Sequence, residues 1–237
     1  MSAFVLVHGA WHGGWCWDKV VARLEAMGHS AVAPDMPGHG SDTAPIRQVT
    51  LEDLVQRVCD TIDAQSEPVV LVGHSYGGAM ITQAAERRAH RIKSLAYVSA
   101  FLLNDGQAMM DMASADTDSH LGPQVAVSGD GATATVKPEA LRDCFYGDCS
   151  EEDFIFARAR LSLEAMAGLI TPMRTTAANF GRVKRTYVEC LKDKAISIGM
   201  QRRMRAALPC EGVVTLDTDH SPFFSAPDAL SAALGRL

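Results

Sequence analysis

Long apolar runs are absent from this 237-residue chain. A helix needs about 20 consecutive apolar residues to cross a bilayer, and no stretch approaches that length. The first residues also lack the basic start, the apolar segment and the small-residue cleavage site of a secretory signal. We therefore expect a cytoplasmic protein that neither spans a membrane nor has a membrane as its partner.

An excess of positive charge is absent as well. The chain has 22 Lys and Arg residues against 28 Asp and Glu residues, for a formal net charge of −6. This balance favours solubility and argues against nucleic acid as a partner, because nucleic-acid-binding proteins present a basic surface. Arg202, Arg203 and Arg205 form a short basic cluster, which we interpret as the solvent-exposed face of a helix.

The spacing that is typical of metal sites is absent from the six cysteines. Without a secretory signal they are expected to be reduced, and several of them to be small core residues. Cys144 and Cys149 are close enough to pair, but nothing requires it. His8 and His12 could suggest a metal pair, yet no third ligand follows at a plausible spacing. We expect neither a metal nor an organic cofactor.

The chain does contain an alternation of short apolar runs with amphipathic stretches, which is typical of a parallel sheet wrapped by helices. Strands are predicted at residues 4–8, 30–33, 68–72, 92–99, 183–190 and 212–216, and helices at residues 13–27, 50–64, 76–89 and 227–237.

The alternation fails between about residues 103 and 180, where a polar Gly/Ser/Thr stretch (residues 127–136) lies among helical segments. The pattern predicts one α/β domain with a mostly parallel six-stranded sheet, built from residues 1–102 and 181–237. Residues 103–180 are predicted to form an inserted helical cap. No internal repeat is visible.

A nucleophile motif, Gly-His-Ser-Tyr-Gly-Gly, occupies residues 73–78 between a predicted strand and a predicted helix. A serine hydroxyl is a poor nucleophile unless it is presented openly beside a base. A sharp strand-to-helix turn presents it, and glycines on both sides allow the tight backbone. The pattern G-x-S-x-G alone is weak, and its context favours Ser75 as a nucleophile over an incidental serine in a glycine-rich turn.

Oxyanion donors are predicted from the same arrangement. The segment His-Gly-Ala-Trp-His-Gly-Gly (residues 8–14) ends the first predicted strand. In a fold with this type of nucleophile turn, one donor comes from such a loop and the other from the residue after the nucleophile. These are the backbone N–H groups of Ala10 and Tyr76. The glycines also permit a tight loop, which is compatible with this role.

The base is expected to be a histidine that follows the nucleophile in the chain. His90 ends a polar helix and His120 lies in the predicted cap. His220 follows the last predicted strand, at the carboxyl edge where catalytic groups gather in open α/β sheets. We therefore assign His220 as the base.

The acid is expected to be a carboxylate that orients the histidine ring and stabilises the imidazolium. Asp193 follows the strand predicted at residues 183–190, next to the strand that leads to His220. Asp217 and Asp219 are the alternatives, but they are too near His220 on its own loop to reach behind the ring easily. Strand position favours Asp193.

The chain resembles a known family in three segments. Residues 4–15 and 73–78 are similar to the plant methylesterase and hydroxynitrile lyase branch of the α/β-hydrolases and its bacterial esterase relatives, which include pyrethroid-ester hydrolases. Residues 180–194 are similar too, and Asp193 and His220 fall where that branch has its acid and base. The resemblance is weakest at residues 105–143. It implies a Ser-His-Asp mechanism on small-molecule esters.

Two positions separate the esterases of this branch from its lyases. The lyases have a threonine after the first-strand histidine and a lysine after the catalytic histidine, whereas this chain has Gly9 and Ser221. The resemblance therefore implies a carboxylesterase for small to medium, hydrophobic or aromatic esters. A lyase-like reaction, a lactonase with the same triad and a ligand receptor on a hydrolase fold remain alternatives. The sequence also leaves a homodimer open.

Apolar side chains recur through the predicted cap, and they have two interpretations. They could line a hydrophobic substrate pocket, or they could pack the cap onto the core domain, and methionine is adaptable enough for both. These residues are Met109, Met110, Met112, Phe154, Phe156, Leu163, Met166, Leu169 and Met173.

Overall fold

The computed structural model describes all 237 residues, and its centre is a six-stranded sheet in which all neighbouring strands are parallel. The strands follow the order β2-β1-β3-β4-β8-β9. Their bounds are Ala3–Val7 (β1), Ser30–Val32 (β2), Val69–His74 (β3), Ile92–Val98 (β4), Arg185–Cys190 (β8) and Gly212–Leu216 (β9). A parallel sheet covered on both faces needs strands that are apolar throughout, and β3 is buried along its whole length. The predicted α/β fold is confirmed.

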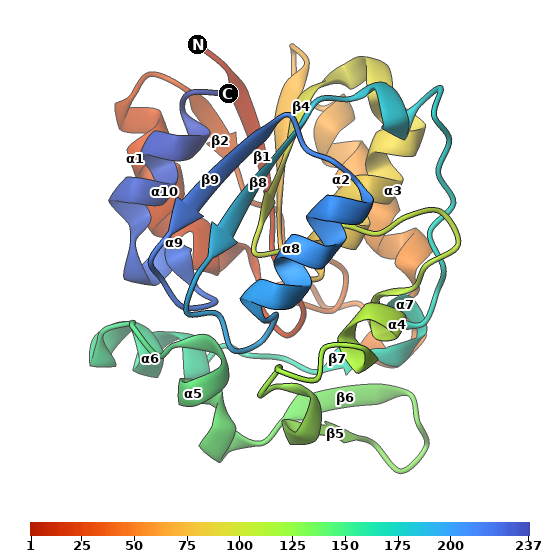
Figure 1. The fold of residues 1–237 in the computed structure, drawn as a ribbon, viewed down its shortest axis with the longest axis vertical. Helices are drawn as coiled ribbons and strands as arrows, with labels where there is room; N and C mark the ends of the chain where they lie inside the picture. Colours follow the sequence, from red (N-terminus) through yellow and green to blue (C-terminus); the bar gives the residue numbers. More distant parts are fainter.

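Helices cover both faces of this sheet (Figure 1). α1 and α10 lie on one face, whereas α2, α3 and α8 lie on the other. Their bounds are Asp18–Ala26 (α1), Leu51–Asp63 (α2), Gly77–Arg88 (α3), Ile198–Ala207 (α8) and Pro227–Leu234 (α10), and a short helix α9 spans Pro222–Ser225. The helix predicted at residues 13–27 is split, because a 3-10 turn over Gly14–Trp17 precedes α1.

The inserted segment, residues 103–180 (the cap), contains strands as well as helices. It lies below the sheet in Figure 1, toward the carboxyl ends of the strands. Its short helices surround a three-stranded antiparallel sheet in the order β5-β6-β7. The bounds are Met109–Ser114 (α4), Val125–Val127 (β5), Thr133–Val136 (β6), Leu141–Phe145 (α5), Glu151–Arg158 (α6), Glu164–Ala165 (β7) and Met166–Leu169 (α7).

Besides its helices, the cap contains a hairpin over residues 125–136, which includes the polar stretch between the predicted helical segments. Ser128 and Gly131 close the turn through a 2.8 Å backbone hydrogen bond, and Gly131 has a φ of +72°, which glycine adopts without a Cβ penalty. Val125 pairs with Val136 across the two strands. Neither strand stands out in the sequence, because both are short and they flank a polar turn.

Two of the three arginines of the basic cluster lie on the solvent-exposed face of α8, as predicted. Arg202 and Arg203 are exposed on α8, while Arg205 is half-buried and pairs with Glu189 at 3.2 Å. All six cysteines are unpaired, and all except Cys210 are buried. None of the helices is long and apolar enough to cross a membrane.

Candidate active site

The turn between β3 and α3 holds Ser75 in a strained conformation. Its φ is +53°, in the left-handed region that side chains other than glycine rarely adopt. A Cβ at Gly73 would lie 2.6 Å from the Gly77 carbonyl oxygen, and a Cβ at Gly77 would lie 2.7 Å from the Val7 carbonyl oxygen. Strain of this kind costs about 1–3 kcal/mol and persists where the surrounding structure enforces it. The two glycines are therefore required for the turn that presents Ser75.

Two backbone N–H groups beside Ser75 have no acceptor in the protein. They belong to Ala10 and Tyr76, and both residues line the same cavity as Ser75. The loop after β1 passes directly against the serine, because a Cβ at Gly9 would lie 2.7 Å from the Ser75 Cβ. A free pair of donors next to a presented hydroxyl is the arrangement that an oxyanion hole requires.

His220 is held from behind by Asp193. Its Nδ1 lies 2.7 Å from Asp193 Oδ2, and both side chains are buried. The other carboxylate oxygen, Oδ1, accepts backbone N–H bonds from Ala195 (2.7 Å) and Ile196 (2.9 Å). Ser99 donates its hydroxyl to Oδ2. The carboxylate is therefore fixed in place and faces the ring.

The two alternative acids do not contact the His220 ring. Asp219 accepts the backbone N–H of Asp148 at 2.9 Å and holds its own loop. Asp217 is exposed and pairs with Lys192 at 3.1 Å. Asp193 is therefore the carboxylate that the fold brings to His220, as strand position predicted.

His74, which directly precedes Ser75 in the chain, contacts His220. The His74 Nε2–H donates to the His220 carbonyl oxygen at 2.7 Å, and the two ring centroids are 4.5 Å apart. Burial holds the pKa of His74 well below its usual value, so the ring is neutral. The His220 ring bonds Asp193 and has no hydrogen bond to Ser75 Oγ, and catalytic hydrogen bonds of this kind often tighten only when the substrate binds. The other two candidate histidines are surface residues, since His90 is exposed and His120 pairs with an exposed aspartate.

The two histidines that suggested a metal pair hold the backbone of the β1 loop. His8 donates through Nδ1 to the Gly9 carbonyl (2.8 Å) and accepts the Met36 N–H through Nε2 (3.1 Å). His12 donates through Nδ1 to the Ala10 carbonyl (2.8 Å), and its Nε2 accepts from a buried tyrosine hydroxyl (2.7 Å). Burial lowers the pKa of His8 to about 3 and that of His12 to about 4. Both rings are neutral, and all four ring nitrogens have protein partners.

The cavity in front of Ser75 is apolar and has a volume of about 450 Å³. Hydrophobic residues make up 14 of the 21 residues that line it. Asp116 is the one charged residue among them, and Ser197 donates to both of its oxygens. Four of the apolar cap residues named from the sequence line this cavity, namely Met109, Met110, Met166 and Leu169. The other five apolar cap residues do not line this cavity. The pocket interpretation therefore applies to four of the nine residues, and packing remains the interpretation for the others.

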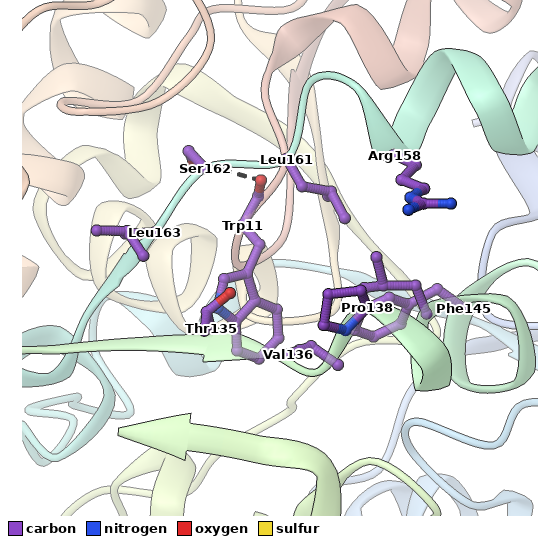
Figure 2. Close-up of a pocket in the computed structure, with 10 residues that line it drawn as sticks. Trp11, Thr135, Val136, Pro138, Phe145, Arg158, Leu161, Ser162 and Leu163 are labelled. Carbon is purple, nitrogen blue, oxygen red and sulfur yellow. Dashed lines mark hydrogen bonds between the residues drawn. The ribbon is translucent and has the colours of Figure 1, made fainter. Parts of the chain in front are cut away.

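A second cavity of about 450 Å³ lies on the other side of Trp11. Trp11 lines both cavities, so this residue forms part of the wall between them. Figure 2 shows the indole beside Thr135 and Val136 of β6, with Phe145 further along the same cavity. The indole N–H donates to the Ala134 carbonyl at 3.0 Å, which anchors the wall to the cap sheet.

Sequence reasoning did not find three residues that support this site. Ser99 follows β4 and also has a positive φ, of +41°, but a serine after a strand carries no distinctive signal. His39 and Glu164 are fully buried and bonded to each other at 3.0 Å, although 125 residues separate them. Only the fold brings such a pair together.

Similarity to known proteins extends over nearly the whole chain. The profile of the alpha/beta hydrolase family matches residues 4–233. A chloroplastic protein of Arabidopsis thaliana named as a methylesterase is 32% identical over 243 residues, which cover 98% of this chain and 62% of that protein. The chain thus spans less than two thirds of that relative.

Two further matches cover both proteins more fully. A pyrethroid hydrolase of Sphingobium wenxiniae is 31% identical over 245 residues, which cover 99% of this chain and 86% of that protein. The crystal structure of an Arabidopsis methylesterase superposes with a TM-score of 0.88 at 26% identity, covering 100% of this chain and 98% of that one. The resemblance predicted from residues 4–15 and 73–78 is confirmed.

Proposed function

This chain belongs to the alpha/beta hydrolase family, and from that premise we propose that it is a serine carboxylesterase for small to medium, hydrophobic or aromatic esters. One observation carries the proposal. The strained Ser75 shares a cavity with the free N–H groups of Ala10 and Tyr76, and the buried His220–Asp193 pair stands beside its turn. The named activities of the methylesterase and pyrethroid hydrolase relatives support ester hydrolysis.

In the proposed reaction, His220 takes the proton of Ser75 as the hydroxyl attacks the ester carbonyl carbon. The carbonyl oxygen becomes an oxyanion that accepts the two free N–H groups, while Asp193 stabilises the imidazolium. The C–O bond then breaks, and His220 gives its proton to the departing alcohol. Water, activated by the same histidine, attacks the acyl-enzyme and releases the carboxylic acid.

The lining of the Ser75 cavity supports an uncharged, apolar substrate. The side chains of Met109, Met110, Met166 and Leu169 offer no partner for a charged group, and the Asp116 carboxylate would repel an anion. Gly9 and Ser221 leave the site without the hydroxyl and the ammonium that the lyases of this branch use at these positions. These features favour hydrolysis over cyanohydrin cleavage.

The proposal is tested by assaying the purified protein on aryl esters whose acyl chains run from acetyl to octanoyl, together with methyl esters of aromatic acids. We expect turnover, with kcat/KM rising along the acyl series until the cavity is filled. No turnover on any ester, together with no reaction of a fluorophosphonate at Ser75, would refute the proposal that this protein is an enzyme. Labelling of Ser75 without ester turnover would refute the carboxylesterase proposal, and lactones would then be the substrates to test.

Substitution of Ala113 by phenylalanine tests the site of the acyl chain. Ala113 lines the Ser75 cavity, and a phenyl ring there would occupy part of its volume. We expect Ala113→Phe to lower kcat/KM for long-chain aryl esters by about 10-fold or more, while acetyl esters change little. Ala126→Phe, on an exposed position of β5 outside the cavity, is the matched control. An equal loss on acetyl and octanoyl esters would contradict this placement.

Substitution of Trp11 by leucine tests the wall between the two cavities. A smaller side chain would open the Ser75 cavity toward the second one. We expect Trp11→Leu to raise kcat/KM for naphthyl-substituted esters relative to phenyl esters by about 10-fold. Trp15→Leu is the control, because Trp15 lines neither of these cavities. An unchanged ratio in a folded Trp11→Leu protein would mean that the wall does not limit substrate size.

A further inference from the structure

A buried ion pair joins the cap to the core domain next to the Ser75 cavity. His39 Nε2 lies 3.0 Å from Glu164 Oε2, and neither side chain is exposed to solvent. His39 Nδ1 lies 3.0 Å from the Pro37 carbonyl oxygen. Since both ring nitrogens face acceptors, both must donate, and the ring is an imidazolium. Burial alone would lower the pKa of His39, but the hydrogen bond and charge of Glu164 outweigh it and raise the pKa.

Glu164 also accepts a backbone hydrogen bond from the β1 loop. The Trp11 N–H donates to the same Oε2 at 3.2 Å, while Oε1 accepts the Ala165 N–H at 3.0 Å. Trp11 has a φ of +64°, so its backbone needs external support. Its carbonyl oxygen accepts the Ser162 N–H at 2.9 Å. Two backbone groups of Trp11 are thus held by the cap.

These contacts fix the peptide that adjoins the Ala10 donor. The peptide between Ala10 and Trp11 has its carbonyl held by His12 Nδ1 (2.8 Å) and its N–H held by Glu164 (3.2 Å). A planar peptide that is held at both ends cannot rotate. The preceding peptide is held at its carbonyl by His8, which leaves the Ala10 N–H as its free group. The direction of that N–H therefore depends on the Glu164 contact.

We propose that Glu164, paired with His39, is a positioning residue that orients the Ala10 N–H of the oxyanion hole, a role that rests on the carboxylesterase function proposed above. The cap would then contribute to catalysis by supplying the carboxylate that sets the loop, in addition to covering the cavity. The hydrogen bond from His39 holds the Glu164 carboxylate directed at the Trp11 N–H.

A purely structural role for this pair makes a different prediction. Replacing both members of a buried ion pair with apolar residues of similar size is often neutral for stability, because it removes the cost of burying two charges. The double variant His39→Leu/Glu164→Leu leaves no unpaired charge but deprives the Trp11 N–H of its acceptor. We expect it to fold with a kcat about 100-fold below wild type, the size of effect that follows misplacement of a catalytic group by about 1 Å.

Three measurements separate positioning from packing. KM of the double variant should stay within about threefold of wild type, because the substrate cavity is unchanged while transition-state stabilisation is lost. Glu164→Gln should retain most of kcat, since its amide oxygen, placed where Oε2 lies, can still accept both the Trp11 N–H and the His39 Nε2–H, and only the Ala165 N–H loses its acceptor. The control Glu189→Gln removes the charge of another buried, ion-paired carboxylate on β8 and should leave kcat unchanged.

The outcomes are distinct. A folded double variant with wild-type kcat would overturn the positioning role, as would a loss that appears only as a higher KM. If the double variant does not fold, the same loss is expected when Trp11 is replaced by its α-hydroxy acid, which puts an ester oxygen in place of the N–H and keeps every side chain. Wild-type kcat in that protein would overturn the role. Failure of the proposed function would look different, as an absence of ester turnover in the wild type itself.

Discussion

Replacing Ser75 with alanine is expected to lower kcat for ester hydrolysis by about 10⁶-fold, the loss seen when the nucleophile of a serine hydrolase is removed. The Ala10 and Tyr76 donors would remain, so a residual rate of about 10³–10⁴-fold over water is expected. The reason is that Ser75 is the hydroxyl that the strained turn presents beside the Ala10 and Tyr76 donors, whereas the hydroxyls of Ser114, Thr117 and Ser119, which also line the cavity, belong to the cap.

The measurement is kcat of wild type and Ser75→Ala on one aryl ester, with folding checked by circular dichroism. Ser94→Ala is the matched control, because Ser94 is a buried serine of β4 whose hydroxyl has no partner. A Ser75→Ala protein that keeps more than about 1% of wild-type kcat would contradict the acyl-enzyme mechanism, which requires a loss of several orders of magnitude.

Asp193→Asn is expected to lower kcat by about 10⁴-fold while the fold is kept, because it inverts the His220 tautomer. Oδ1 of Asp193 accepts two backbone N–H groups, from Ala195 and Ile196. In the asparagine variant only the amide oxygen can take that position, so the amide NH2 must face His220. Nδ1 of the ring then has to accept, its proton moves to Nε2, and the ring can no longer take the proton of Ser75.

Asp219→Asn is the control for this prediction. Asp219 lies directly before His220 in the chain but holds the loop through the Asp148 N–H and does not bond the ring. Its substitution should cost stability, because the buried Asp219 carboxylate accepts several hydrogen bonds, and should leave kcat within about 10-fold of wild type, because none of those bonds reaches the His220 ring. If Asp219→Asn lost more activity than Asp193→Asn, Asp193 would not be the acid.

The three residues that we propose as the triad could be selected from the sequence because each follows a strand. Ser75, Asp193 and His220 come after β3, β8 and β9, and the carboxyl ends of parallel strands meet at one edge of the sheet. The order of the three residues along the chain and the glycines on both sides of Ser75 narrowed the choice of candidates further. The loop donors were predictable for the same reason, since the loop that holds Ala10 follows β1.

The supporting contacts could not be predicted, because they join segments that are distant in sequence. Glu164 lies in a two-residue strand, and its partner His39 is in a loop 125 residues earlier. Neither has a pattern that distinguishes it from a surface residue. The hairpin at residues 127–136 was missed because two short strands and a polar turn resemble a loop. Only the tertiary structure shows that this hairpin carries the Ala134 carbonyl that anchors Trp11.

The most direct test of the account is to identify the residue that a fluorophosphonate modifies. The protein is incubated with the reagent until esterase activity is lost, its intact mass is measured, and the adduct is mapped by peptide mass spectrometry. If Ser75 is the nucleophile, we expect one adduct per chain, located on Ser75 and formed in step with the loss of activity. Full inactivation with the adduct on another residue, or esterase activity that survives complete modification of Ser75, would contradict it.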